Sequence, residues 1–153
     1  MSWLYNGKKI ENIEEFPQGT IGFVYKITHI PTQKSYIGKK ILHFTKKTKL
    51  GKKEMKLLKG GVGRPSTSKI VVKESDWLSY YSSNLEIKKL VKEGKGEEFE
   101  RLILKCVPSK KLLSYYESKC QFLENVLEMP GWYNDNIAGK FYRKDFIDNM
   151  LED

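Results

Sequence analysis

Two tyrosines and two lysines are the first residues whose types and spacing suggest chemistry. Tyr25 and Tyr36 are eleven positions apart, and the second is followed by Ile37-Gly38 and then by Lys39 and Lys40. Aromatic rings beside ammonium groups favour contact with a nucleic acid. The same residues also suit a cross-strand aromatic pair on a half-buried sheet, with lysines that protect a strand edge.

The positive charge of the chain is concentrated in one segment. Between Lys39 and Lys73, eleven lysines and one arginine stand against a single acid, Glu54, which gives this segment +11. Because the whole chain carries +9, the rest is about −2. Such a distribution is typical of a nucleic-acid contact, and a solvated, self-repelling loop is the alternative. The predicted DNA-binding cations are Lys40, Lys46, Lys47, Lys49, Lys52, Lys53 and Arg64.

Glu117 is a further candidate for a functional residue, because it offers a carboxylate on a predicted helix. Residues 110–127 have helical apolar spacing. The predicted core stripe is Leu112, Tyr116, Cys120, Leu123 and Leu127. Glu117 lies at the margin of this stripe, where a carboxylate can face a cleft. The alternative is a surface glutamate that pairs with Lys110 or Lys119.

The elements that position these residues can be predicted from the same patterns. The predicted strands are residues 22–28, 35–42 and 99–107, and the predicted helices are residues 84–93 and 110–127. A capping box from Ser83 to Glu86 begins the first helix at Asn84. Trp77 and Tyr80 are assigned to the core.

The remaining segments complete a single domain with extensions. Residues 1–18 are predicted to be an N-terminal extension with a hairpin turn at Asn6-Gly7. The main domain covers residues 19–145 and contains a basic insertion, 45–73, and residues 146–153 form a C-terminal tail with a short helix. Within the insertion we expect a short helix over 52–59. Gly63-Arg64-Pro65 faintly resembles an AT-hook core, with a plain linker as the alternative.

Composition excludes several classes of protein. A chain of 153 residues with 39% hydrophobic content supports one domain with a core. No apolar run is long enough to span a membrane and no secretory signal opens the sequence, so a cytoplasmic location is expected. Cys106 and Cys120 are expected to be reduced, and the two histidines and two cysteines do not have zinc-ligand spacing.

The hairpin resembles the signature of the GIY-YIG nuclease family. The first half of the signature, Gly-Ile-Tyr, is replaced here by Phe23-Val24-Tyr25 after Gly22. The second half, Tyr-Ile-Gly, is intact as Tyr36-Ile37-Gly38 and is followed by Lys39. The likeness covers about residues 19–139. A Trp77-x-x-Tyr-Tyr81-Ser-Ser piece makes the chain similar to small stand-alone bacteriophage endonucleases of that family. The resemblance implies a small α/β (α+β) domain whose three-stranded antiparallel sheet is flanked by helices.

The resemblance also implies a function and a set of site residues. It implies a DNA endonuclease that depends on Mg²⁺ or Mn²⁺, in which Glu117 is the single metal ligand and Asn134 supports the site. Tyr25 would be the general base or would position the water, with a pKa lowered by the metal and by lysines. Tyr36, Lys39 and Tyr81 would orient and neutralise the scissile phosphate.

One departure from the family pattern concerns an arginine. Members place an arginine eight to ten residues beyond Tyr-Ile-Gly, where this chain has Lys46 and Lys47, and the next arginine is Arg64. A lysine neutralises a phosphate but does not grip it with two parallel hydrogen bonds. Two other functions remain open at this stage: a non-catalytic nucleic-acid-binding protein of the same fold, and an RNA-binding basic protein. The oligomeric state is also open.

Overall fold

The hairpin that carries Tyr25 and Tyr36 forms one edge of a mixed sheet. Strand β3 (Gly22–His29) pairs antiparallel with β4 (Lys34–Ile41), in a register that sets Tyr25 opposite Gly38 and Tyr36 opposite Ile27. On its other side β3 pairs antiparallel with β7 (Phe99–Val107). These are the three strands that the sequence predicts, so their existence and pairing are confirmed.

Two further strands correct the prediction of a three-stranded sheet. Strand β1 (Trp3–Tyr5) pairs parallel to β7, and β2 (Lys8–Ile10) pairs antiparallel to β1, so the order is β2-β1-β7-β3-β4. The predicted Asn6-Gly7 turn joins them, with φ of 50° and 79°, as the mirror-image turns of two-residue hairpins require. These strands have three residues each, too few for alternation to appear in the sequence.

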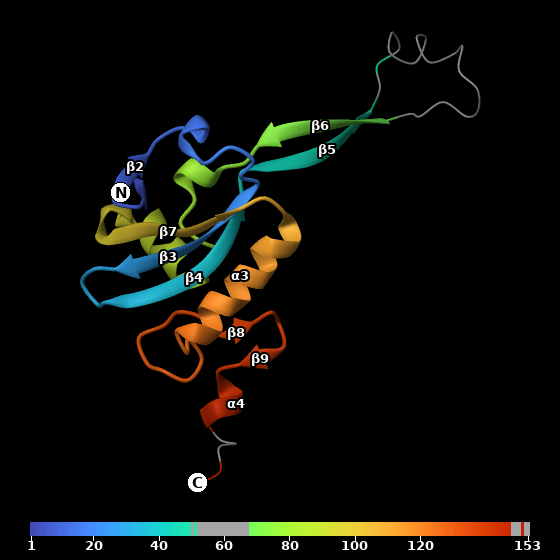
Figure 1. The fold of residues 1–153 in the computed structure, drawn as a ribbon. Helices are drawn as coiled ribbons and strands as arrows, with labels where there is room; N and C mark the ends of the chain where they lie inside the picture. Colours follow the sequence, from blue (N-terminus) through green and yellow to red (C-terminus); the bar gives the residue numbers. More distant parts are fainter. Residues whose placement is uncertain (50, 52–67, 148–150, 152–153) are drawn as a thin grey trace. The chain divides into compact units, whose positions relative to one another are not determined.

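The computed structural model describes residues 1–49, 51, 68–147 and 151, which fall into two compact units (Figure 1). The first unit comprises Met1–Leu42 and Asp76–Asp153 and contains the five-stranded sheet. The second unit, His43–Ser75, contains a ribbon of β5 (His43–Lys49) and β6 (Ser68–Glu74). The helix expected over 52–59 and the Gly63-Arg64-Pro65 tripeptide lie outside the described residues.

Both faces of the sheet in the first unit are covered by apolar side chains. One face packs Phe23, Tyr25 and Trp3 with Trp77 of the 3-10 turn η2 (Trp77–Ser79) and Ile87 of helix α2 (Leu85–Lys92). The other face packs Val24 and Ile37 against Leu113 of helix α3 (Lys110–Leu123), the orange helix of Figure 1. Strand β3 is buried almost throughout because its alternate side chains enter two separate cores.

Both predicted helices exist, with corrected ends. Helix α2 is capped by Asn84 instead of Ser83, since the Asn84 side chain accepts hydrogen bonds from the backbone N–H groups of Glu86 and Ile87. Ser82 has φ of 126° and turns the chain just before this cap. Helix α3 ends at Leu123, four residues before the predicted end.

The remaining elements are short. They are the 3-10 turns η1 (Ile13–Glu15) and η3 (Gly96–Glu98), a two-stranded pair of β8 (Asn136–Ile137) and β9 (Phe141–Tyr142), and helix α4 (Lys144–Ile147). The predicted C-terminal helix therefore begins two residues earlier than expected. Among the described residues, no helix has the length and hydropathy needed to cross a membrane.

Candidate active site

Helix α3 presents Glu117 inward, which corrects the predicted stripe. The face that packs on the sheet carries Leu113 and Gln121, which are buried, with Glu117 halfway between them at spacings of four residues. Two members of the predicted stripe, Leu112 and Leu123, are instead 39% and 71% exposed. The Leu112-Leu113 pair made the helix phase ambiguous in the sequence, because either leucine suits a core face. Glu117 is therefore more central to the inward face than a margin position would make it.

A cleft of about 450 Å³ brings the candidate residues of two elements together. It is lined by Tyr36 of β4, by Glu117 and Gln121 of α3, by Ser83 and Asn84 before α2, and by the segment that begins at Asn134. Tyr36 packs on the face of the sheet opposite to the one that α3 covers, but Tyr36 and Glu117 both line this cleft beside β4, the last strand of the sheet order. The Tyr36 hydroxyl lies 3.3 Å from Ser83 Oγ, and either group could donate that hydrogen bond.

The electrostatics of the cleft keep its acidic groups protonated to higher pH. Burial raises the pKa of Glu117, and the nearby Lys39 acts in the opposite direction. Lys39 donates a hydrogen bond from Nζ to Ser114 Oγ at 2.8 Å, and its Nζ lies 4.0 Å from Glu117 Oε1. Burial also raises the pKa of Tyr36, and Glu117 adds to this because it disfavours a second negative charge.

Tyr25 lies in the core, with its ring centroid 6.3 Å from that of Tyr36. Its side chain is 1% exposed, and burial, followed by Tyr80 and Tyr36, raises its pKa well above 10. The chain alone therefore shifts this pKa in the direction opposite to the one expected. A Cβ on Gly38 would come within 2.5 Å of the Tyr25 hydroxyl, so the glycine of Tyr-Ile-Gly makes room for this phenol.

The structure associates Tyr80 with the signature tyrosines and places Tyr81 elsewhere. The Tyr80 ring packs edge-to-face on Tyr25, with ring centroids 5.9 Å apart. Tyr81 instead accepts a hydrogen bond from the N-terminal ammonium at 3.0 Å and stacks on Arg101. The Tyr-Tyr doublet was the available signal, but adjacency in sequence does not show which ring points toward the sheet.

Lys40 is engaged within the protein. Its Nζ donates to Asp76 Oδ1 at 2.5 Å and lies 4.0 Å from the centroid of the Tyr80 ring, and only 16% of its side chain is exposed. This ion pair lowers the pKa of Asp76. These contacts indicate that Lys40 holds Tyr80 in place, and they argue against the predicted role of Lys40 as a DNA-binding residue.

Asn134 pairs with the open edge of β4 through its side chain. Its Oδ1 accepts from the Ile37 N–H at 3.1 Å, and its Nδ2 donates to the Ile37 carbonyl at 2.9 Å. Gln121 Nε2 donates to the same carbonyl at 2.9 Å. Asn134 therefore fixes the backbone between Tyr36 and Gly38, as a supporting residue would.

Arg143, which the sequence analysis did not select, holds the segment that contains Asn134. Its guanidinium donates to five backbone carbonyls, those of Val126, Leu127, Met129, Trp132 and Asn134. The sequence around Arg143 could not predict this role, because the carbonyls that it binds are spread over nine residues of irregular chain.

The remaining predicted cations lie in the second unit or outside the described residues. Lys46, Lys47 and Lys49 are exposed on β5. Lys52, Lys53 and Arg64 belong to the part of the chain that the structure does not describe.

The residues of the cleft fit a hydrated hard cation. Glu117 offers one carboxylate. The buried Gln121 Oε1, one turn away on the same helix, has no hydrogen-bond partner among the described residues and is a second oxygen donor. Within the described residues no group of three or more His, Cys, Asp and Glu could hold a metal. Mg²⁺ suits such a site because it keeps several waters and is often held by one or two carboxylates plus phosphate.

The fold and this cleft define an α+β domain with the signature hairpin of a nuclease. In agreement with this, the family model described as "Putative endonuclease segE, GIY-YIG domain" matches residues 3–137. The chain therefore belongs to the GIY-YIG nuclease family and carries its segE-type domain. No curated protein and no solved structure matches the chain.

Proposed function

We propose that the protein is a divalent-metal-dependent endonuclease that hydrolyses phosphodiester bonds of DNA in the Tyr36–Glu117 cleft. The observation that carries this proposal is that the Tyr36 phenol and the Glu117 carboxylate line one cleft, with the Lys39 ammonium 4.0 Å from that carboxylate. Membership of the GIY-YIG family supports the nuclease part of the proposal.

Three groups have distinct tasks in the proposed reaction. Glu117 would hold Mg²⁺ or Mn²⁺, which when bound neutralises phosphate charge and lowers the pKa of a bound water. The Lys39 ammonium neutralises a further phosphate oxygen and partly opposes the rise that burial causes in the pKa of Glu117. Tyr36 has a raised pKa, so its hydroxyl is neutral near pH 7 and donates a hydrogen bond to the phosphate or orients the attacking water.

In this proposal Tyr25 supports the structure of the site and does not act as the general base. A phenol that is 1% exposed, with a pKa well above 10, holds its proton at neutral pH. Its ring contact with Tyr80 and its packing against Gly38 keep the strand of Tyr36 in place.

The experiment is incubation of purified protein with supercoiled and linear DNA, in Mg²⁺, in Mn²⁺ and in EDTA. Nicking or linearisation that requires the divalent ion supports the proposal. Salt-sensitive binding of DNA without any cleavage in either metal would instead identify a non-catalytic nucleic-acid-binding protein that keeps the fold.

A further inference from the structure

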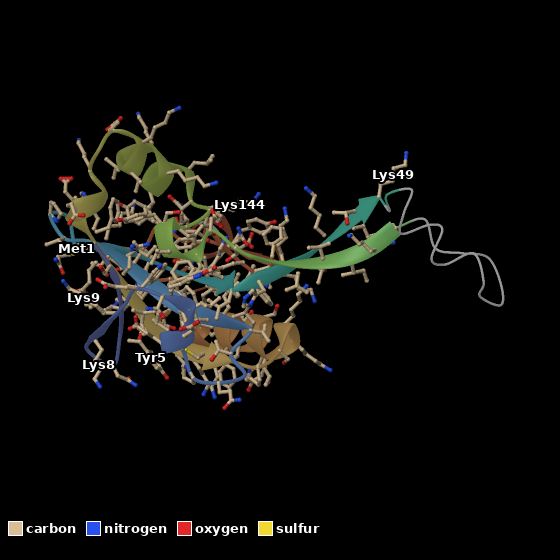
Figure 2. The ribbon with its side chains drawn as sticks, turned by 90° about the horizontal axis from the view of Figure 1, so that it is seen from above. Met1, Tyr5, Lys8, Lys9, Lys49 and Lys144 are labelled. Carbon is tan, nitrogen blue, oxygen red and sulfur yellow. The ribbon has the colours of Figure 1, made fainter. Side chains whose placement is uncertain are left out.

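The second unit is a cationic β-ribbon. Strands β5 and β6 pair in continuous register from His43 opposite Glu74 to Lys49 opposite Ser68. Figure 2 shows side chains leaving both faces of this ribbon, with Lys49 at the end of β5. The strands contain one acid, Glu74, and five lysines, namely Lys46, Lys47, Lys49, Lys69 and Lys73.

The register divides these lysines between two unlike faces. Residues directly opposite each other in an antiparallel pair project to the same side, and the side alternates along the strand. The first side, here called the Lys46 face, consists of Phe44, Lys46, Thr48, Lys69, Val71 and Lys73. The second side, here called the Ile70 face, consists of His43, Thr45, Lys47, Lys49, Ser68, Ile70, Val72 and Glu74.

The Lys46 face has the charge that a polyanion requires. It carries three lysines and no acid, whereas the Ile70 face carries two lysines and Glu74. Lys46 is diagonal to both Lys69 and Lys73, and such positions are about 7–8 Å apart. Three lysines at that spacing place three positive charges on one face, and bound phosphates would neutralise them. Phe44, which is 38% exposed on the same face, offers an apolar group of the kind that contacts thymine methyls.

The dimensions of the ribbon select a groove. Two strands lie about 4.8 Å apart before side chains are added. The major groove of B-DNA is about 12 Å wide and admits a two-stranded ribbon as it stands. The minor groove is about 6 Å wide, and a ribbon enters it only where the DNA is deformed at a cost in free energy. The major groove of an RNA duplex is deep and narrow, and side chains cannot read it.

We propose that the ribbon docks into the major groove of duplex DNA through its Lys46 face, with the Ile70 face turned away from the DNA. The inference rests on the proposed function, because it takes DNA as the substrate. It separates lysines that are neighbours in sequence: Lys46 contacts the DNA and Lys47 does not.

The test compares two double variants with the same loss of charge in the full chain. Lys46→Thr with Lys73→Thr alters the Lys46 face, and Lys47→Thr with Lys49→Thr alters the Ile70 face. Threonine suits strands, and circular dichroism checks that both variants fold. Binding to a 30-base-pair duplex is measured in EDTA between about 50 and 200 mM salt, in a Glu117→Gln background, so that cleavage plays no part.

The proposal predicts that the first pair loses roughly tenfold or more in affinity and flattens the log–log salt slope by about 1.8, which is two phosphate contacts. The second pair should bind within about twofold of its parent. The major-groove ligand methyl green should displace the protein, and the minor-groove ligand netropsin and duplex RNA should compete poorly.

Equal losses in the two pairs, or displacement by netropsin alone, would overturn the proposal. A wild-type chain that binds DNA through the Lys46 face but never cleaves it refutes the proposed function and leaves this inference standing. If the wild-type chain cleaves DNA but the two double variants bind DNA equally well, the proposed function stands and this inference is refuted.

Discussion

At the scale of single residues, Glu117 sits where its own charge is unfavourable. Burial raises its pKa, and Lys39 only partly opposes this. A carboxyl whose pKa is higher in the folded chain than in the unfolded chain stabilises the fold only while it is protonated. Its contribution is fully present below the unfolded pKa and is lost as the pH rises through the folded pKa. In the metal-free chain the ionised Glu117 is therefore a cost to stability at neutral pH.

The first prediction follows because the ionised Glu117 lowers the stability of the metal-free chain at neutral pH. In EDTA at pH 7, Glu117→Gln should melt above the wild-type chain, by about 2–4 °C for each kcal/mol gained. The difference should shrink as the pH falls below about 4, where the carboxyl is protonated in both states. Thermal melts at the two pH values measure it, and Glu128→Gln, at an exposed position in the turn after α3, is the control. A Glu117→Gln protein no more stable than wild type at pH 7 would contradict the assigned burial.

The second prediction concerns Gly38. A Cβ there would lie 2.5 Å from the Tyr25 hydroxyl and 2.8 Å from the Tyr36 ring, closer than real Cβ atoms come. Gly38→Ala should therefore destabilise the fold by about 1–3 kcal/mol and displace both phenols, with a loss of cleavage. Gly51→Ala is the control, because within the described part of the chain no atom lies within 4 Å of a Cβ at Gly51. Urea denaturation that found the two variants equally stable would refute this packing.

At the scale of elements, the site depends on the irregular segment after α3. The Ser35 N–H donates to the Gly131 carbonyl, the Tyr133 N–H donates to the Ser35 carbonyl, and Asn134 bonds Ile37. This segment therefore completes the edge of β4 beside Tyr36. Arg143 in turn holds the segment through its carbonyls.

The third prediction is that Arg143→Met destabilises the domain and lowers cleavage without abolishing DNA binding. Leaving a buried carbonyl unpaired costs about 1–3 kcal/mol, and a lysine should restore little, because it lacks the planar fork. Lys140→Met is the control, since Lys140 is exposed on the neighbouring turn. Urea melts and nicking rates measure the two effects. If Arg143→Lys matched wild type in both, the fork of hydrogen bonds would not be what positions Asn134.

The elements differ in how far the sequence predicts them. Strands β3, β4 and β7 and both helices could be predicted because alternation, caps and apolar spacing are local signals. The pairing of β1 with β7 joins residues almost a hundred positions apart, and no local pattern encodes it. The ribbon was missed for another reason: its exposed lysines interrupt alternation, so the segment resembled a loop. The predicted inward face of α3 was wrong because Leu112 and Leu113 are adjacent, and either leucine could have marked the core face.

At the scale of the whole molecule, charge and chemistry are assigned to different parts of the chain. The five-stranded unit contains the cleft with Tyr36 and Glu117, and the second unit contains the lysine ribbon. The sequence alone indicates this division, because all but two of the cations of the +11 segment follow the signature hairpin. It could not show that Tyr25 is buried or that Tyr80 replaces Tyr81 beside it, since both depend on contacts between distant segments.

The most direct test of the account is plasmid nicking by Glu117→Gln in Mg²⁺, beside the wild-type chain and Glu124→Gln. Glutamine keeps the shape of the side chain and removes the charge that would hold the cation. The account predicts a loss of roughly 10²-fold or more in rate, with DNA binding kept or tightened, while Glu124→Gln cuts normally. A Glu117→Gln protein that cleaves at the wild-type rate would contradict the assignment of Glu117 as the metal ligand.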